Sequence, residues 1–182
     1  MKKTVIILLI LLLISGCSLK NIDNTPTKQV ETFFNNYQTL DKKVLDDLDI
    51  VIAKQTDFTD KQKEEYRKIL KKHYQNLTYE IKEETINGNR ANVEVEIEVT
   101  DFYKILNESN EYLKNNSDEF YDQQNNYDES KFINYQLEKL KDANETVKYT
   151  LNLTLLKNDD GDWILDDIDD IQEKKILGIY EY

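Results

Sequence analysis

Residues 77–100 read LTYEIKEETINGNRANVEVEIEVT, and this stretch decides the fold. Apolar and polar residues alternate from Leu77 to Lys82 and again from Ala91 to Thr100, with the turn-forming residues Asn87-Gly88-Asn89 between the two runs. A period of two on both sides of a turn predicts a β-hairpin with one buried face. The hairpin is therefore the first element around which the rest of the chain can be placed.

The register of this hairpin follows from its apolar residues. A slip of one residue would move a whole strand's side chains to the opposite face. A three-residue loop sets Ile81 opposite Val95 and Tyr79 opposite Ile97, which keeps the apolar residues together. We therefore expect Asn89, the last residue of that loop, to adopt the left-handed conformation.

Helical periodicity surrounds the hairpin. Apolar residues recur at three- and four-residue steps from Pro26 to Leu48, and Ile50–Lys54 continues this pattern after a bend. Thr59 and Gln62 have the spacing of a capping box and open a helix that runs to Leu77. The patterns further along predict two helices, two strands and a short last helix: Asp101–Leu113, a helix from Ser130, Val147–Leu155, Trp163–Leu165, and a helix from Asp169 to Gly178. The fold class is α+β, with helices on a mainly antiparallel sheet.

Composition limits the partners of this protein. The chain has 182 residues with 24 Lys and Arg against 36 Asp and Glu, and it has one cysteine, so no disulfide can form within the chain. A strongly acidic surface repels nucleic-acid phosphates and anionic lipid head groups. We expect no nucleic-acid partner and no electrostatic adhesion to a membrane.

The first seventeen residues predict export. Lys2 and Lys3 precede an apolar run, Val5–Ile14, which has roughly half of the ~20 residues that a membrane-spanning helix needs. An A-x-A-like site, which would end an ordinary signal peptide, is absent. The sequence Leu13-Ile14-Ser15-Gly16-Cys17 instead resembles the bacterial lipoprotein signal, which implies cleavage before Cys17 and a diacylglyceryl group on its sulfur.

This resemblance divides the chain into three parts. Residues 1–16 would be the signal peptide, residues 17–26 the lipidated cysteine with a short tether, and residues 27–182 the domain. Loss of the signal removes both of its lysines and leaves 22 basic against 36 acidic residues, a net charge of −14. Two acyl chains anchor a protein stably. We expect a protein held on the extracytoplasmic side of the cell membrane through Cys17.

His73 is the only histidine and the first candidate for chemistry. It is either a general base on an inner wall or a histidine at the edge of the core with one nitrogen satisfied. A lone histidine without a second ligand makes no metal site. The acidic run 159–170 lacks the first ligand of an EF-hand loop, and no motif for nucleophilic, phosphoryl-transfer or hydride chemistry is present. We expect no metal and no cofactor.

Aromatic side chains are the second candidate set. Five of them fall on inward faces and either form core or line a concave apolar pocket with polar tips: Tyr37, Tyr66, Tyr74, Tyr149 and Trp163. Tyr79 also faces inward, and it is the nearest acid–base partner that the pattern offers for His73.

The order of elements resembles the nuclear transport factor 2-like superfamily, over roughly Pro26 to Ile179. The resemblance is closest to exported lipoproteins of low-GC Gram-positive bacteria that carry such a domain. It is carried by six short stretches: Pro26-Thr27-Lys28-Gln29-Val30, Tyr66–Tyr74 with Leu77-Thr78-Tyr79, Asn87–Val93, Asp101-Phe102-Tyr103-Lys104, Gly161-Asp162-Trp163 and Ile176-Leu177-Gly178. It implies a cone of helices against a bent sheet.

Two functions follow from these patterns. The first is a non-catalytic, lipid-anchored module that binds a small ligand, a peptide or an envelope partner. The second is an isomerase- or hydrolase-type enzyme that uses His73 and an inward tyrosine such as Tyr79, because enzymatic members of that superfamily place Asp or His with Tyr inside the cone.

Overall fold

The computed structural model describes residues 24–182. The predicted signal peptide and Cys17 lie outside these residues. The elements in chain order are α1 (Pro26–Thr39), α2 (Lys42–Ala53), α3 (Asp60–Asn76), β1 (Thr78–Asn87), β2 (Arg90–Thr100), α4 (Phe102–Asn115), a 3₁₀ turn (Ser117–Phe120), α5 (Glu129–Asp142), β3 (Thr146–Lys157), β4 (Trp163–Leu165) and α6 (Asp170–Ile176).

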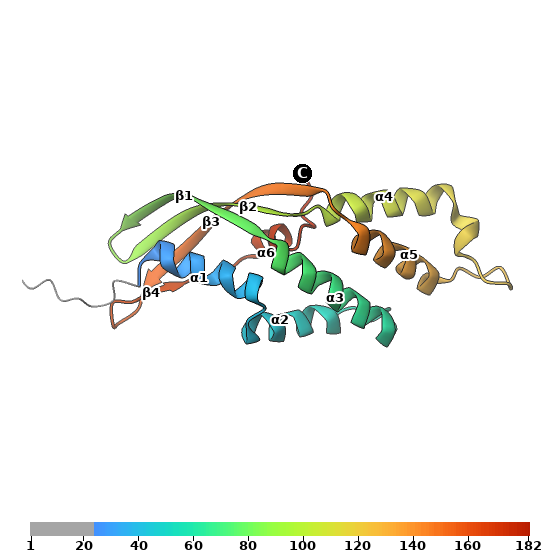
Figure 1. Cartoon of the computed structure of the whole chain (residues 1–182), viewed down its shortest axis with the longest axis horizontal. Helices are drawn as coiled ribbons and strands as arrows, with labels where there is room; N and C mark the ends of the chain where they lie inside the picture. The colour runs from blue at the N-terminus through green and yellow to red at the C-terminus, as the bar shows by residue number, and fades with distance from the viewer. Residues whose placement is uncertain (1–23) are drawn as a thin grey trace, which may run out of the picture.

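The four described strands form one antiparallel sheet in the order β1-β2-β3-β4. The sheet occupies one end of an elongated molecule, α1 lies along one of its faces, and the α4–α5 pair extends from the other end beside α3 (Figure 1). The predicted α+β class is confirmed. The core lies between the sheet and the helices and includes Val30, Phe34, Val95, Ile97 and Leu153.

The hairpin register is confirmed near Tyr79 and wrong near the turn. Tyr79 pairs with Ile97 and Ile81 with Val95, but an irregularity between Ile81 and Glu83 inserts one extra residue, Lys82, into β1. A β-bulge of this kind shifts all later pairs by one.

The turn compensates for this extra residue. Asn87 pairs with Arg90, so the loop has two residues, and Gly88 rather than Asn89 has the positive φ, 61°. Glycine adopts this conformation without steric cost. The hairpin therefore has a two-residue loop, and the extra residue that the prediction placed in the loop lies in β1 as the bulge at Lys82.

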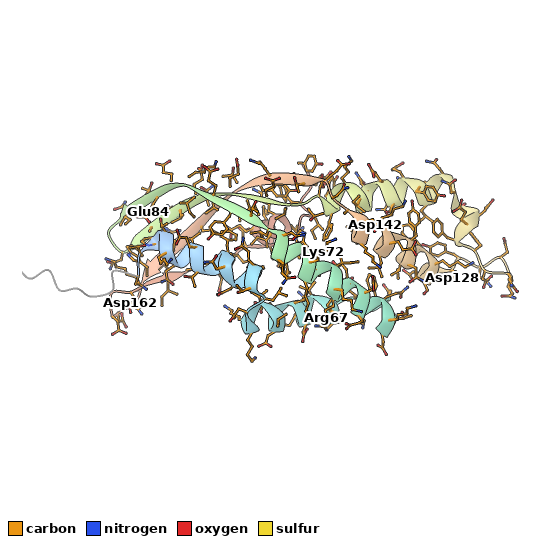
Figure 2. All side chains as sticks on the ribbon, in the orientation of Figure 1. Arg67, Lys72, Glu84, Asp128, Asp142 and Asp162 are labelled. Atoms are coloured by element: carbon orange, nitrogen blue, oxygen red, sulfur yellow. The ribbon has the colours of Figure 1, made fainter. Side chains whose placement is uncertain are left out.

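The bulge turns Glu84 toward the face of the sheet that α1 covers, at an exposed position near the edge of the sheet. Glu84 pairs with Val93, whose side chain faces the core, so its carboxylate points toward the start of α1. One carboxylate oxygen accepts hydrogen bonds from the backbone N–H (2.9 Å) and the hydroxyl (2.6 Å) of Thr27. Figure 2 shows Glu84 beside the first turn of this helix. The positive end of α1 is thus capped by a distant strand as well as by Thr25, which accepts from Lys28 N–H.

The helix predicted from Pro26 to Leu48 is two helices. α1 ends at Leu40, which has φ 55°, and Asp41 then caps α2 by accepting from the N–H of Lys43. The periodicity hid this break because both helices keep an apolar stripe toward the same core. The predicted capping box of α3 is confirmed: Thr59 accepts from Gln62 N–H, and the Gln62 side chain accepts from Thr59 N–H.

Gln62 also joins α3 to α5. Its side chain is 3% exposed, and Nε2 donates to the backbone oxygen of Ser130 and to Asn134 Oδ1, both at 2.9 Å. These bonds fix the start of α5 against the start of α3. The two helices therefore run side by side and leave a cleft further along.

The opposite face of the sheet is polar and carries Glu94, Glu96 and Glu98, as the alternation from Ala91 to Thr100 predicts. Glu96 lies 2.9 Å from the Lys148 ammonium on the neighbouring strand, and Glu98 accepts from Thr146 at 2.7 Å. None of the helices within residues 24–182 is long and apolar enough to cross a membrane.

Candidate ligand-binding cleft

A cleft of about 430 Å³ lies between α3, the last turn of α5 and the junction of β2 with α4. This volume is within the range of small-molecule sites. Its apolar floor is made by Ile69, Phe102 and Leu140, all of which are buried. Figure 2 labels Lys72 on α3 and Asp142 at the end of α5, the two helices that border the cleft.

One stripe of α3 supplies most of the lining. Its six cleft residues stand at helical spacings of three and four: Glu65, Lys68, Ile69, Lys72, His73 and Asn76. Residues at such spacings share one helix face. The neighbouring face of α3 carries Leu70 and Tyr74 into the main core. The face of α3 with Leu70 and Tyr74 is therefore part of the main core, whereas the face that lines the cleft carries both polar and apolar residues.

His73 lies at the floor of the cleft and is 2% exposed. Its ring stacks on Phe102 with the centroids 4.6 Å apart, and Nε2 lies 2.8 Å from the backbone oxygen of Ile176. A carbonyl oxygen only accepts, so Nε2 carries the proton and Nδ1 is a bare acceptor. Burial lowers the pKa of His73 to about 4, and the hydrogen bond to Ile176 opposes this shift. The ring is neutral at pH 7.

The second nitrogen of this ring is unusual. Nδ1 is the one fully buried side-chain nitrogen or oxygen within residues 24–182 that has no hydrogen-bond partner. An unsatisfied buried acceptor is costly, and such a group in a native structure calls for an explanation. The predicted core-edge histidine with one satisfied nitrogen matches this geometry.

Positive charge gathers at the rim. Lys68, Lys72 and Lys141 line the cleft with a single acidic residue, Glu65. Lys141 pairs with Glu65 at 3.3 Å, and Lys68 lies 3.8 Å from Glu64. Lys72 is exposed and makes no ion pair within the described part of the chain. The rim is a cationic spot on an acidic protein.

The five predicted pocket aromatics do not share one site, and none of them lines this cleft. Tyr37 and Tyr74 meet edge to face at 5.0 Å and line a smaller hollow of about 240 Å³ beside α2 and α6, while Tyr66 packs on Phe58. Burial raises the pKa of Tyr37 to about 12 and also raises the pKa values of Tyr66 and Tyr74.

The remaining two aromatics lie elsewhere. Tyr149 donates to the backbone oxygen of Tyr180 at 2.9 Å, and burial raises its pKa to about 12. Trp163 packs under Lys157, and its backbone N–H donates to Asn24 at 2.5 Å. Tyr149 thus fixes the segment around Tyr180, and Trp163 fixes the segment that leads into α1. Asn24, which was predicted to belong to the tether, is therefore in contact with the domain.

His73 and Tyr79 have different surroundings. Tyr79 stacks on Phe34, and its hydroxyl lies 3.4 Å from Asn35 Oδ1 on α1, whereas His73 contacts α4 and the end of α6. Tyr79 does not line the cleft. An acid–base pair needs both groups within reach of one substrate atom. No group of three or more His, Cys, Asp or Glu side chains within residues 24–182 is placed to hold a metal ion.

Neither the lysines of the rim nor the role of Phe102 was predicted from the sequence. A signal for the lysines was present, because Lys68 and Lys72 stand at i and i+4 and flank Ile69 and His73 on one helix face. Phe102 and Leu140 come from other elements, and no local pattern joins them to α3. The cleft depends on the packing of α5 against α3.

No protein-family model and no curated protein sequence matches this chain. Among solved structures, the chain is similar to YcdA of Bacillus subtilis, described as "a putative lipoprotein", with 18% identity and a TM-score of 0.44. The match covers 68% of this chain and 39% of YcdA, so this chain spans well under half the length of that protein.

Proposed function

We propose that this protein is a lipid-anchored, extracytoplasmic binding module that holds a small ligand in the cleft between α3 and α5 without transforming it. The observation behind this proposal is the cleft itself, with an apolar floor of Ile69, Phe102 and Leu140 and polar groups at its rim. A concave, mostly apolar site with a few polar groups is typical of small-molecule binding.

Binding is preferred to catalysis because of the state of His73. Its ring is 2% exposed, its Nε2 is already bonded, and its predicted partner Tyr79 lies outside the cleft. A general base near pH 7 needs a pKa near that pH, whereas burial lowers the pKa of His73 to about 4.

The anchor is proposed from residues 1–17 alone. Cys17 precedes Asn24 by seven residues, a length of chain that reaches at most about 25 Å. Asn24 is bonded to Trp163 of β4, at the sheet end of the molecule (Figure 1). With a lipid on Cys17, the sheet end faces the bilayer and the α4–α5 pair points away from it.

A nuclear transport factor 2-like architecture is part of the same proposal. Three helices precede the hairpin, and helices cover one face of the sheet, as in that superfamily. The α4–α5 pair inserted between β2 and β3 and the short β4 are features of this chain. The fold by itself does not specify an activity.

Ligand retention tests the binding role. The chain from Ser18 to Tyr182 contains every core residue and every element described above, so it can be studied without its lipid once a cooperative melt shows that it is folded. We expect mass spectrometry to find a small molecule retained from a metabolite extract, and Ala143→Trp, at the cleft wall, to lose it. Ala53→Trp, at the exposed end of α2, is the control. Equal retention by the wild type and Ala143→Trp would refute a ligand site in this cleft.

Membrane fractionation tests the anchor. We expect Cys17→Ala to leave the membrane fraction while its fold is unchanged, because the charge of the acidic domain opposes adhesion to anionic lipids. Ser18→Ala keeps the cysteine and is expected to stay with the membrane. If Cys17→Ala still sediments with membranes, the lipoprotein assignment is wrong.

A further inference from the structure

The charge distribution around the cleft indicates the kind of ligand. The mature chain would have a net charge of −14, yet the rim combines Lys68, Lys72 and Lys141 with Glu65 alone. A concave site with charges of one sign and apolar walls concentrates the field that acts on a ligand. The rim therefore selects a negative group.

The number of rim lysines without an acidic partner indicates how much negative charge the ligand carries. Glu65 compensates Lys141 at 3.3 Å, and Glu64 lies 3.8 Å from Lys68. Of the three rim lysines, Lys72 is the one that makes no ion pair with another residue of 24–182. One free cation matches the single charge of a carboxylate better than the double charge of a phosphate monoester.

The floor of the cleft indicates the rest of the ligand. Ile69, Phe102 and Leu140 present apolar surface, and the His73 ring between α3 and Phe102 is neutral. No positive charge lies below the rim within the residues that line the cleft. A ligand is thus oriented with its anionic end outward at Lys72 and its apolar body on the floor.

We propose that the cleft binds an amphiphilic carboxylate, with the carboxylate at Lys72 and the apolar body on Ile69, Phe102 and Leu140. This inference rests on the proposed binding function and adds the ligand's chemical class and orientation. The volume of about 430 Å³ suits a medium-chain carboxylate and not a macromolecule.

Calorimetric titration with octanoate and octanamide tests this inference, because the two probes have nearly the same shape and differ in charge. We expect the folded chain from Ser18 to Tyr182 to bind octanoate at one site and about ten-fold more tightly than octanamide. Lys72→Glu is expected to weaken octanoate about ten-fold, since it replaces an attraction by a repulsion, and to leave octanamide unchanged. Lys61→Glu makes the same change three turns away on α3, beyond the screening length at physiological salt, and is expected to bind octanoate like the wild type.

The outcomes separate the ligand class from the binding function. Equal affinity for octanoate and octanamide, or equal losses in Lys72→Glu and Lys61→Glu, would overturn the carboxylate assignment. If neither probe binds but Ala143→Trp still loses a ligand taken from the extract, the binding function stands and the ligand class is wrong. If the wild type and Ala143→Trp retain the same molecules, the binding function itself fails.

Discussion

Gly178 offers the sharpest test of how the cleft floor is built. It has φ 69°, and a Cβ at this position would lie 2.1 Å from the backbone oxygen of Thr100 and 3.2 Å from Cε1 of His73. Its own carbonyl accepts from Tyr103 N–H at 2.7 Å, which ties the end of the chain to the start of α4. The glycine therefore allows three segments to meet directly behind the histidine ring.

Gly178→Ala is expected to destabilise the protein by about 3 kcal/mol or more. The left-handed conformation costs a residue with a Cβ about 1–2 kcal/mol, and forcing atoms into a packed site costs about 1–3 kcal/mol more. The carbonyl of Thr100 belongs to β2 and cannot turn aside without breaking strand contacts. A loss of this size lowers the melting temperature by about 6–12 °C in a domain of this length.

Gly161→Ala is the matched control. Gly161 has φ 84°, so the alanine meets the same backbone penalty, but nothing lies within 4 Å of the added carbon. Urea denaturation followed by circular dichroism gives both free energies of unfolding. We expect Gly161→Ala to lose only about 1–2 kcal/mol. Equal losses in the two variants would show that the contact with Thr100 is relieved at little cost, and the close packing behind His73 would be refuted.

Three further predictions concern the contacts that join distant elements. Glu84→Ala removes the cap that β1 gives to α1 and is expected to lower the melting temperature by about 2–4 °C, whereas Glu83→Ala, on the exposed side of the strand, leaves it unchanged in a thermal scan. Gln62→Leu removes two hydrogen bonds from α3 to α5 and is expected to cost about 1–3 kcal/mol in urea denaturation, while Gln75→Leu, at an exposed position, is near neutral; equal effects would contradict the link through Gln62. The pKa of His73 is about 4 in the folded protein and 6.5 in the unfolded chain, so the unfolded chain binds more protons between these pH values. The contribution of neutral His73 to the free energy of unfolding is therefore complete above pH 6.5 and is lost as the pH falls toward 4. The whole contribution is about 3 kcal/mol. His73→Phe keeps the stacked ring and is expected to remove this part of the pH dependence of stability; an unchanged profile would show that His73 titrates normally.

The hairpin shows where local reasoning succeeds and where it stops. The pairing of Tyr79 with Ile97 was predictable because the apolar face had to stay together. The bulge at Lys82 was not predictable from the sequence. An extra residue in the strand and an extra residue in the loop both give the same pairing of Tyr79 with Ile97. The reason for the bulge lies in α1, whose first turn is capped by Glu84 across the domain.

Some features of the helices were also predictable from the local sequence, and others were not. The cap at Thr59 and the helix start at Asp169 were predictable because a cap and its helix are adjacent in sequence. The break at Leu40 was not, because the apolar stripe continues through it into α2. Periodicity reports which face is buried and says little about whether the axis changes direction.

The sequence by itself determined the α+β class, the strands, the starts of α1, α3 and α6 and the likeness of residues 13–17 to a lipoprotein signal, since all of these depend on short-range patterns. Only the tertiary structure decided the cleft. Lys72 and His73 lie on α3, Phe102 is the first residue of α4, and Leu140 lies in the last turn of α5. The link from Gln62 to α5 sets the distance between the helices. Of the five aromatic residues expected to line one pocket, Tyr37 and Tyr74 share a small hollow and the other three lie in separate contacts, because inward-facing positions on different elements can share a core without sharing one cavity.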